Sequence, residues 1–303
     1  TKTIPETHTP VPVAPSEAAP SAAIAIPTMQ PSPAAPSPAF PTTTQPATAE
    51  PTALLPDGPE CPVAPVIDAS MQSHLREIYA RGQELGNNPQ AFSKVGDCGS
   101  TPAWFLGDFE RGPRYYSLGE YSGLEEVIQV FQGSFDRTSL AAKAGFTTAS
   151  VLAPLWADRK QCQSNESPLA CEYRLHRPSI ALVTLGTNDI WHEGDFEPQL
   201  RTIIETSLDQ GVIPVLATKA DDLEGDGSIN ATIVHLAQEY NLPVWNYWRA
   251  VQPLPDQGLQ EDSAHITWGP NRFDDPEAML KGWPWRNLTA LQVLDAVWHS
   301  LTP

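Results

Sequence analysis

Two continuous apolar segments are the strongest pattern along the chain. Residues 180–185 read IALVTL and residues 212–218 read VIPVLAT, and neither segment contains a charged residue. Apolar runs of this length are typical of strands that are buried on both faces of a parallel sheet. Two shorter candidates, residues 91–96 and 243–247, complete the expected strands.

Segments with helical spacing of apolar residues lie before, between and after these strands. The first covers residues 69–85, where Leu75 and Ile78 fall on one face and Asp68 stands at the N-cap position. The other expected helices cover residues 124–131, a short segment after Thr147, and residues 196–208, 229–240 and 287–301, the last with Asn287 as its N-cap. Alternating strands and helices predict an α/β fold, with a parallel sheet covered by helices on both faces. Such sheets bind ligands at the carboxyl ends of their strands.

Residues 1–60 differ in composition from the rest of the chain. They hold 15 of the 32 prolines and no Trp or Tyr, whereas all nine Trp and all seven Tyr lie beyond residue 60. A segment of this kind cannot bury enough apolar surface to offset the entropy lost when it orders. We therefore expect a disordered stalk or linker, rich in Pro, Ala, Thr and Ser, over residues 1–60 and one domain over residues 61–303.

Charge and the chain's N-terminal features bear on its partners and location. The formal net charge is -18, and a polyanionic surface repels nucleic-acid backbones and anionic lipid headgroups. No run of 18 apolar residues is present, so no membrane span is expected. The chain has no initiating Met and no signal-peptide segment, and it starts with a Pro-rich stalk. These features suggest a trimmed, extracellular or cell-surface protein.

The four cysteines agree with an oxidising compartment. Cys162 and Cys171 enclose eight mostly polar residues, so a local disulfide is expected between them. Cys61 and Cys98 remain, and parity in an exported chain suggests that these two thiols pair with each other.

Three short segments carry the candidate chemistry. Residues 95–100 read VGDCGS and residues 185–189 read LGTND, each beside the end of an expected strand, and residues 262–265 read DSAH in a polar loop. Because Asp262 lies three residues before His265, its carboxylate can bind one imidazole nitrogen and leave the other free as a base.

Two further groups can stabilise an oxyanion. Asn188 lies in LGTND and can offer its side-chain amide, and the backbone N–H of residue 98 can act as a second donor. Together with the Asp–His pair, these groups are typical of acyl transfer.

The order of these motifs resembles the SGNH (GDSL-like) hydrolases, over roughly residues 90–300. The resemblance implies a three-layer α/β/α sandwich of flavodoxin-like character and ester hydrolysis that needs no metal or organic cofactor. Asn188 matches the family's GxND motif, and Asp262 and His265 match its DxxH motif. Gly145 is the candidate oxyanion-hole glycine of the second family block, although Lys143 stands where the family usually has Asn.

The family's nucleophilic Ser is replaced by Cys98, and three interpretations stay open. Cys98 can be bonded to Cys61, which leaves a catalytically inactive binding or surface-structural module. Alternatively, Cys98 is a free thiol nucleophile activated by His265. In the third interpretation Ser100 attacks instead, although two residues shift a Cα atom by up to ~7 Å, so the loop would have to be rebuilt.

Three tryptophans follow the three motifs: Trp104, Trp191 and Trp268. Indole rings at a sheet edge can stack on sugars, so we expect a carbohydrate ester as the substrate, with an acetyl ester on a polysaccharide as the candidate; ordinary packing is the alternative. Residues 221–227, DDLEGDG, cluster four carboxylates. They lack the alternation of an EF-hand and are expected to form a solvated loop.

Overall fold

Four parallel strands form the central sheet of the computed structural model, which describes residues 61–301. The predicted stalk over residues 1–60 lies outside the described residues. The strands follow the order β1 (Asn88–Gly96), β3 (Pro178–Thr184), β4 (Ile213–Ala217) and β5 (Val244–Trp245). The predicted strands are confirmed, with ends that differ by up to three residues. Every residue of β3 and β4 is buried, as their continuous apolar sequences require.

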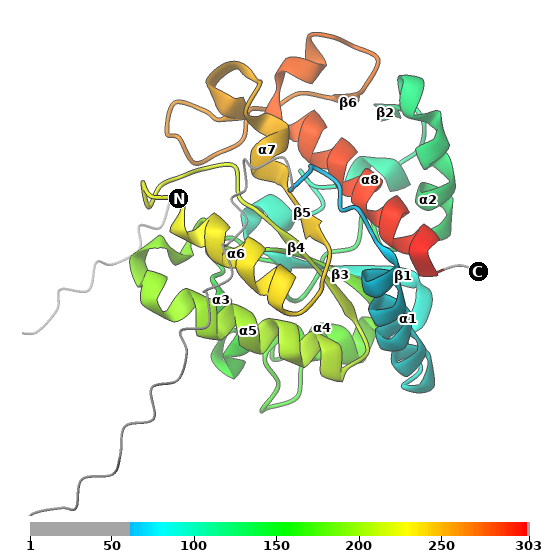
Figure 1. Ribbon diagram of the computed structural model, residues 1–303, viewed down its shortest axis with the longest axis vertical. Helices are drawn as coiled ribbons and strands as arrows, with labels where there is room; N and C mark the ends of the chain where they lie inside the picture. Colours follow the sequence, from blue (N-terminus) through cyan, green and yellow to red (C-terminus); the bar gives the residue numbers. More distant parts are fainter. Residues whose placement is uncertain (1–60, 302–303) are drawn as a thin grey trace, which may run out of the picture. The chain divides into compact units, whose positions relative to one another are not determined.

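Helices cover both faces of the sheet, so the predicted α/β/α arrangement is confirmed (Figure 1). On one face, α1 (Ala69–Glu84) packs against α8 (Gly282–Leu301). The other face carries α4 (Pro168–His176), α5 (Glu193–Asp209) and α6 (Ser228–Glu239). Asp68 caps α1 as predicted, because its side chain accepts a hydrogen bond from the backbone N–H of Met71 at 2.8 Å.

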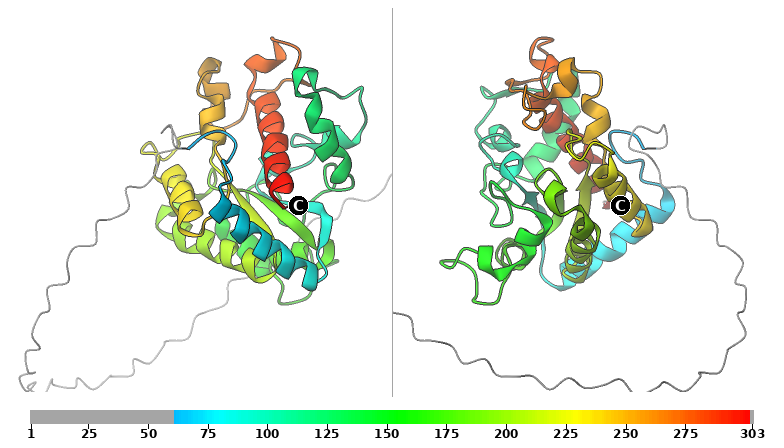
Figure 2. Two further views of the ribbon diagram at one scale, coloured as in Figure 1. Left: turned by 45° about the vertical axis from the view of Figure 1, so that its right-hand side comes forward. Right: turned by 90° about the vertical axis from the view of Figure 1, so that its left-hand side faces the viewer.

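The remaining elements are short and lie in the connections. They are α2 (Glu125–Val130), α3 (Thr148–Leu152), α7 (Tyr247–Val251), a second parallel sheet of β2 (Tyr116–Ser117) and β6 (Asn271–Arg272), and 3-10 turns at Cys98–Ser100, Gly107–Glu110, Gly119–Leu124, Pro154–Trp156, Asp189–His192, Pro255–Gly258 and Ala278–Leu280. The segment between α7 and α8 lies with the start of α8 at one end of the described chain, beyond the sheet (Figure 2). No helix within residues 61–301 is long and apolar enough to cross a bilayer.

The predicted N-cap of the last helix is wrong. Helix α8 begins at Gly282, five residues before Asn287, and Asn287 is buried inside it. Its side-chain oxygen accepts a hydrogen bond from the backbone N–H of Leu106 at 2.8 Å, and its amide donates to the side chain of Asn271 at 2.9 Å. Asn287 therefore satisfies buried polar groups of two distant segments, which is a tertiary role that a capping pattern does not predict.

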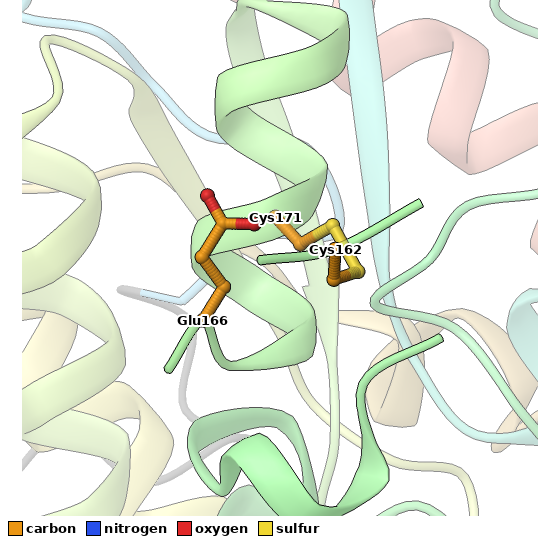
Figure 3. Close-up of side chains that lie close together, drawn as sticks. All are labelled: Cys162, Glu166 and Cys171. Atoms are coloured by element: carbon orange, nitrogen blue, oxygen red, sulfur yellow. A yellow bond between two sulfur atoms is a disulfide. The ribbon is translucent and has the colours of Figure 1, made fainter. Parts of the chain in front are cut away.

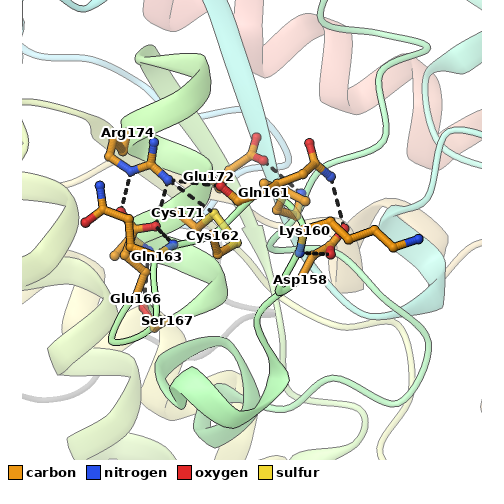
Figure 4. The surroundings of a disulfide bond; sticks show 12 residues. Asp158, Lys160, Gln161, Cys162, Gln163, Glu166, Ser167, Cys171, Glu172 and Arg174 are labelled. Carbon is orange, nitrogen blue, oxygen red and sulfur yellow. Dashed lines mark hydrogen bonds and ion pairs between the residues drawn. A yellow bond between two sulfur atoms is a disulfide. The ribbon is translucent and has the colours of Figure 1, made fainter.

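The expected disulfide between Cys162 and Cys171 is confirmed, with a Cα–Cα distance of 5.3 Å. It joins a surface loop to the first half of α4 (Figure 3), so the connection is partly helical rather than a loop throughout. Arg174 binds the carboxylate of Glu166 beside it (Figure 4). Closing so short a loop stabilises a fold by roughly 2–3 kcal/mol.

Candidate active site

A pocket of about 580 Å³ lies at the carboxyl ends of the strands. Residues that follow β1, β3 and β4 line it, together with the loop before α8 and the first turns of α8 itself. The pocket brings together six of the residues singled out from the sequence: Cys98, Trp104, Asn188, Trp191, His265 and Trp268. The rule that parallel strands gather their ends at one edge thus explains how segments far apart in the sequence meet.

Asp262 and His265 form the hydrogen-bonded pair expected from their spacing. The imidazole Nδ1 lies 2.6 Å from one carboxylate oxygen of Asp262, and the other oxygen accepts the backbone N–H groups of Ala264 at 3.1 Å and His265 at 2.9 Å. These hydrogen bonds lower the pKa of Asp262 to about 2, so the carboxylate is ionised at neutral pH. Among the described residues none bonds Nε2 of His265, which leaves this nitrogen available to a substrate or nucleophile.

Cys98 begins the 3-10 turn that follows β1, and its side chain is half-buried with a free thiol. The carboxylate of Asp97 caps the turn by accepting the backbone N–H of Gly99 at 2.8 Å. Burial, followed by the nearby charge of Asp97, raises the pKa of the Cys98 thiol, while the Gly99 N–H and Arg286 oppose that shift. No hydrogen bond joins Cys98 to His265 within residues 61–301, although both line the pocket.

The expected disulfide between Cys61 and Cys98 is wrong, because the thiol of Cys98 is free. Cys61 is buried beside Asn246, whose side-chain amide donates to its carbonyl oxygen at 2.8 Å and approaches its sulfur at 3.2 Å. Asn246 directly follows β5, whereas Cys98 lies two residues beyond β1 at the opposite end of the strand order. Three strand spacings amount to about 14 Å, and a disulfide needs its Cα atoms within about 7 Å.

Ser100 does not line the pocket. Its side chain is fully buried and forms a hydrogen bond with the hydroxyl of Thr184 on β3. Ser100 packs closely against Gly96: a Cβ atom added to Gly96 would come within 2.2 Å of the Ser100 hydroxyl oxygen. The 3-10 turn thus directs Cys98 toward the pocket and Ser100 into the core, which does not fit the interpretation in which Ser100 attacks a substrate.

Asn188 and Gly145 are neighbours, but they differ in their access to the pocket. The side-chain amide of Asn188 donates one hydrogen bond to the carbonyl oxygen of Phe146 at 3.0 Å, which leaves its second N–H unused by that bond. Gly145 is the third residue of the turn that the Phe146 N–H closes onto Lys143, and its φ of +79° explains the choice of glycine. Gly145 is not among the described residues that line the pocket.

Several solved structures are similar to this chain. A GDSL-like lipase from Bacteroides thetaiotaomicron shares 13% identity and a TM-score of 0.43, over 75% of this chain and 98% of that one. A lipase/acylhydrolase from Enterococcus faecalis shares 19% identity and a TM-score of 0.42, over 70% and 97%. A catalytic mutant of an acetylxylan esterase from Geobacillus stearothermophilus shares 14% identity and a TM-score of 0.41, over 67% and 93%. No protein-family model and no curated protein matches the chain.

Two buried cations that line the pocket were not predicted from the sequence. The first is Lys219, whose ammonium group pairs with Asp221 at 2.7 Å and also with Glu224. Both carboxylate side chains are almost fully buried, so the expectation of a solvated loop over residues 221–227 is wrong for these two. The cation lies two residues before the acidic segment in the sequence, and this short separation is the signal that could have identified the pair.

The second missed cation is Arg286 in the first turns of α8. Its side chain lies against the rings of Phe105, Trp245, Tyr247 and Trp283. The sequence signal was the segment WPWR at residues 283–286, in which an arginine follows two tryptophans. The predicted helix began too late to include it.

One cluster of the described residues has ligand atoms close enough together to hold a metal ion: Cys162, Glu166 and Cys171 (Figure 3). Metals bind cysteine as the thiolate, and here both sulfurs are consumed by the disulfide. The carboxylate of Glu166 is also bound by Arg174. This cluster fits a structural cross-link.

Proposed function

We propose that the protein is an ester hydrolase of the SGNH type, with Cys98 as its nucleophile. The observation that carries the proposal is the pocket itself, which holds a free Cys98 thiol together with His265, whose imidazole is oriented by an ionised Asp262. A nucleophile, a base and a group that orients the base are the minimal set for acyl transfer.

The reaction would proceed in two balanced halves. Nε2 of His265 takes the thiol proton while the sulfur of Cys98 attacks the ester carbonyl carbon, and the carbonyl electrons move onto oxygen. The resulting intermediate collapses, the C–O bond breaks, and the proton passes from His265 to the leaving alcohol. Water then attacks the thioester with His265 as base, which releases the acid and restores the thiol.

The raised pKa of Cys98 bears on how this nucleophile would be activated. A thiol that is mostly protonated at neutral pH needs a base that removes its proton during the attack. The free Nε2 of His265 supplies that base once it reaches the thiol, and the His265 side chain is 65% exposed in its loop. The backbone N–H of Cys98 and the second amide N–H of Asn188 would stabilise the oxyanion, with Gly145 as the turn residue that positions the carbonyl bound by Asn188.

We further propose a carbohydrate ester, with a sugar acetyl ester as the candidate substrate. Trp104, Trp191 and Trp268 line the pocket while 50%, 81% and 63% exposed, and exposed indole rings are suited to stacking on sugars. The disulfide between Cys162 and Cys171 supports an exported protein, since disulfides persist in oxidising compartments.

Hydrolysis of p-nitrophenyl acetate, followed by release of p-nitrophenol, tests the proposal. We expect Cys98→Ala to abolish activity and His265→Ala to lower kcat by about 10²- to 10⁴-fold. His235→Ala is the matched control, because His235 is a partly exposed histidine on α6 outside the pocket. Its activity should equal that of the wild type.

Two results would contradict this mechanism. Activity that survives His265→Ala at the wild-type level would remove the base from the proposal. A wild-type protein without esterase activity on aryl and sugar acetates, but with saturable sugar binding in the pocket, would establish the binding module instead. Cys98→Ser is informative in both cases. The serine hydroxyl takes the place of the thiol, and its reactivity no longer depends on the formation of a thiolate.

A further inference from the structure

Arg286 stands out in the pocket because its buried charge has no partner among residues 61–301. Its side chain is only 6% exposed, yet the residue lines the pocket beside Asp97, Cys98 and Gly99. A guanidinium group carries five N–H donors and no acceptor. Among residues 61–301, none accepts a hydrogen bond from this group or forms an ion pair with it, and its Nε atom is fully enclosed without a partner. Burial of an unsatisfied cation is costly, so such groups are normally paired.

Aromatic rings hold the guanidinium in place without using its donors. The Cζ atom lies 5.0 Å from the ring centre of Phe105, 5.4 Å from Trp245, 5.2 Å from Tyr247 and 5.8 Å from Trp283. Such contacts attract the positive charge through the ring faces. They do not satisfy the N–H groups in the plane of the guanidinium. Because Nε is enclosed, the Nη groups are the donors that remain for a ligand in the pocket.

The nearest carboxylates of the protein are used elsewhere. Asp97 and Asp221 act on Arg286 through space, but neither lies within 4.0 Å of it as an ion pair. Asp97 accepts the backbone N–H of Gly99, and Asp221 binds Lys219 and the hydroxyl of Thr187. In this arrangement, none of the described residues supplies the acceptor that Arg286 lacks.

We propose that Arg286 is the binding site for a carboxylate on the ligand of this pocket. A planar carboxylate matches the planar guanidinium and can accept two parallel hydrogen bonds from it. Since this proposal deepens the proposed function, it narrows the substrate class to carbohydrate esters that bear a carboxylate, such as esters of an acidic sugar. Arg286 would position the substrate beside Cys98, and it would exchange no proton with it.

The position of Arg286 limits where the carboxylate would lie. Three side chains surround the point that a Cβ atom on Gly99 would occupy: a carboxylate oxygen of Asp97 lies 3.1 Å from it, one Nη atom of Arg286 3.7 Å and Trp283 3.9 Å. The pocket beside the nucleophile is thus lined by a cation, the Asp97 carboxylate, an indole ring and the backbone of Gly99. The ligand carboxylate would therefore approach Arg286 from the side away from Asp97, whose like charge would repel it.

Equilibrium binding of matched probes tests the proposal. D-glucuronate and D-glucuronamide differ in charge but hardly in shape, and sodium acetate with acetamide forms a second such pair. Binding is followed by tryptophan fluorescence at constant ionic strength, because Trp283 contacts Arg286 and stacks on Trp104 with ring centres 6.1 Å apart. We expect at least one of the two carboxylates to bind about 10-fold or more tightly than its amide, as charge-assisted hydrogen bonds allow.

Variants identify the residue responsible. Arg286→Met should lower the affinity for the carboxylate about 10- to 100-fold, and Arg286→Lys should retain part of it because the charge stays while the planar pair of donors is lost. Arg272→Met is the control, since Arg272 is an exposed arginine on β6 that does not line the pocket. Arg286→Met is first checked for wild-type circular dichroism, and Arg286→Lys keeps the test valid if the methionine variant does not fold.

The experiment separates this proposal from the proposed esterase activity. It is carried out on Cys98→Ala as well as on the wild type, so carboxylate binding is measured where no hydrolysis can occur. Equal affinities for carboxylates and amides, or an affinity that survives Arg286→Met, would overturn the proposal while p-nitrophenyl acetate hydrolysis still stands. Arg286-dependent binding by a protein without esterase activity would support the carboxylate site and refute the hydrolase.

Discussion

Lys219 and Arg286 line the same pocket as buried cations, and the protein satisfies them in opposite ways. Lys219 is 5% exposed and donates to the backbone carbonyl and the carboxylate of Asp221 at 2.9 Å and 2.7 Å, and to Glu224. Arg286 is as deeply buried, but aromatic rings surround it and none of the described carboxylates pairs with it. A paired buried charge fixes a loop, whereas an unpaired one facing a pocket is suited to a ligand.

The local sequence explains the difference. Lys219 lies two residues before Asp221 at the end of β4, so its partners come from the same turn and are present whenever that loop folds. Arg286 lies on a helix, and its neighbours Phe105 and Trp245 come from distant segments that offer ring faces. The ammonium group of Lys219 therefore needs no ligand, whereas the guanidinium of Arg286 keeps N–H donors that none of the described residues accepts.

The largest expected effect is on stability. Lys219→Met would leave the buried carboxylates of Asp221 and Glu224 without their cation, which typically costs about 3–5 kcal/mol. Arg286→Met leaves none of the described side chains without its partner. The variant loses the ring contacts, but it no longer has to bury a charged group, and these two effects oppose each other. Its free energy of unfolding should therefore stay within about 1 kcal/mol of the wild type. Urea unfolding followed by circular dichroism at neutral pH measures both values.

Lys160→Met is the control for this comparison, because Lys160 is exposed and its replacement should change stability by less than about 0.5 kcal/mol. If Arg286→Met destabilises the fold as much as Lys219→Met does, Arg286 is a structural residue, and the distinction between the two cations is lost. A triple variant that combines Lys219→Met with Asp221→Asn and Glu224→Gln should recover part of the stability, since the uncompensated charges are then removed as well.

A third buried cation, Lys94, extends the comparison to the dependence of stability on pH. Lys94 on β1 donates to the carbonyl oxygen of Phe135 at 2.7 Å, and burial lowers its pKa to about 7, with Arg137 adding to the shift. The unfolded chain, with a lysine pKa near 10.5, binds more protons than the folded one between these two values. The contribution of Lys94 to stability therefore increases as pH rises from about 7 toward 10, and it is smallest below 7.

Lys94→Met isolates this contribution. The variant should gain stability relative to the wild type at pH 6, and that advantage should shrink steadily up to pH 10, as measured by urea unfolding across the range. Arg272→Met provides the matched loss of one exposed positive charge and should run parallel to the wild type. A constant difference between Lys94→Met and the wild type at every pH would show that Lys94 is charged in the folded protein throughout.

The sheet and most of the site residues could be predicted because local patterns determine them. Continuous apolar segments at residues 180–185 and 212–218 marked strands buried on both faces, and the strand rule then brought Cys98 and Asn188 to one edge. The pairing of Asp262 with His265 was also predictable, since a separation of three residues places both side chains in one turn.

The wrong predictions concern groups whose partners lie far away in the sequence. Parity suggested that Cys61 and Cys98 pair, but an even number of cysteines says nothing about the distance between them. Cys98 follows β1, whereas Cys61 lies beside Asn246, which follows β5 at the opposite end of the strand order. Asn287 has the composition of an N-cap, yet it bonds to Leu106, 181 positions away. The unpaired state of Arg286 depends on which rings surround it, so only the folded chain reveals it.

The smallest expected effect is on the reactivity of Cys98, and it tests how Arg286 and Asp97 change the pKa of this thiol. Because burial and Asp97 raise the pKa of the thiol, its alkylation by iodoacetamide should become about tenfold faster per pH unit without levelling off below pH 8.5. Arg286→Met removes a charge that lowers this pKa and should slow alkylation a few-fold at pH 7.5. Asp97→Asn should accelerate alkylation, and it keeps the oxygen that accepts the Gly99 N–H.

Two controls accompany these variants. Arg272→Met, which is exposed and outside the pocket, should leave the rate unchanged, and Cys98→Ser gives the background alkylation of the buried Cys61. Mass spectrometry of quenched samples gives the rate at residue 98. A rate that is independent of pH from 6 to 8 would mean that Cys98 is already a thiolate, in which case Arg286 acts as its counter-ion and a ligand carboxylate would compete with the thiolate for the same positive charge.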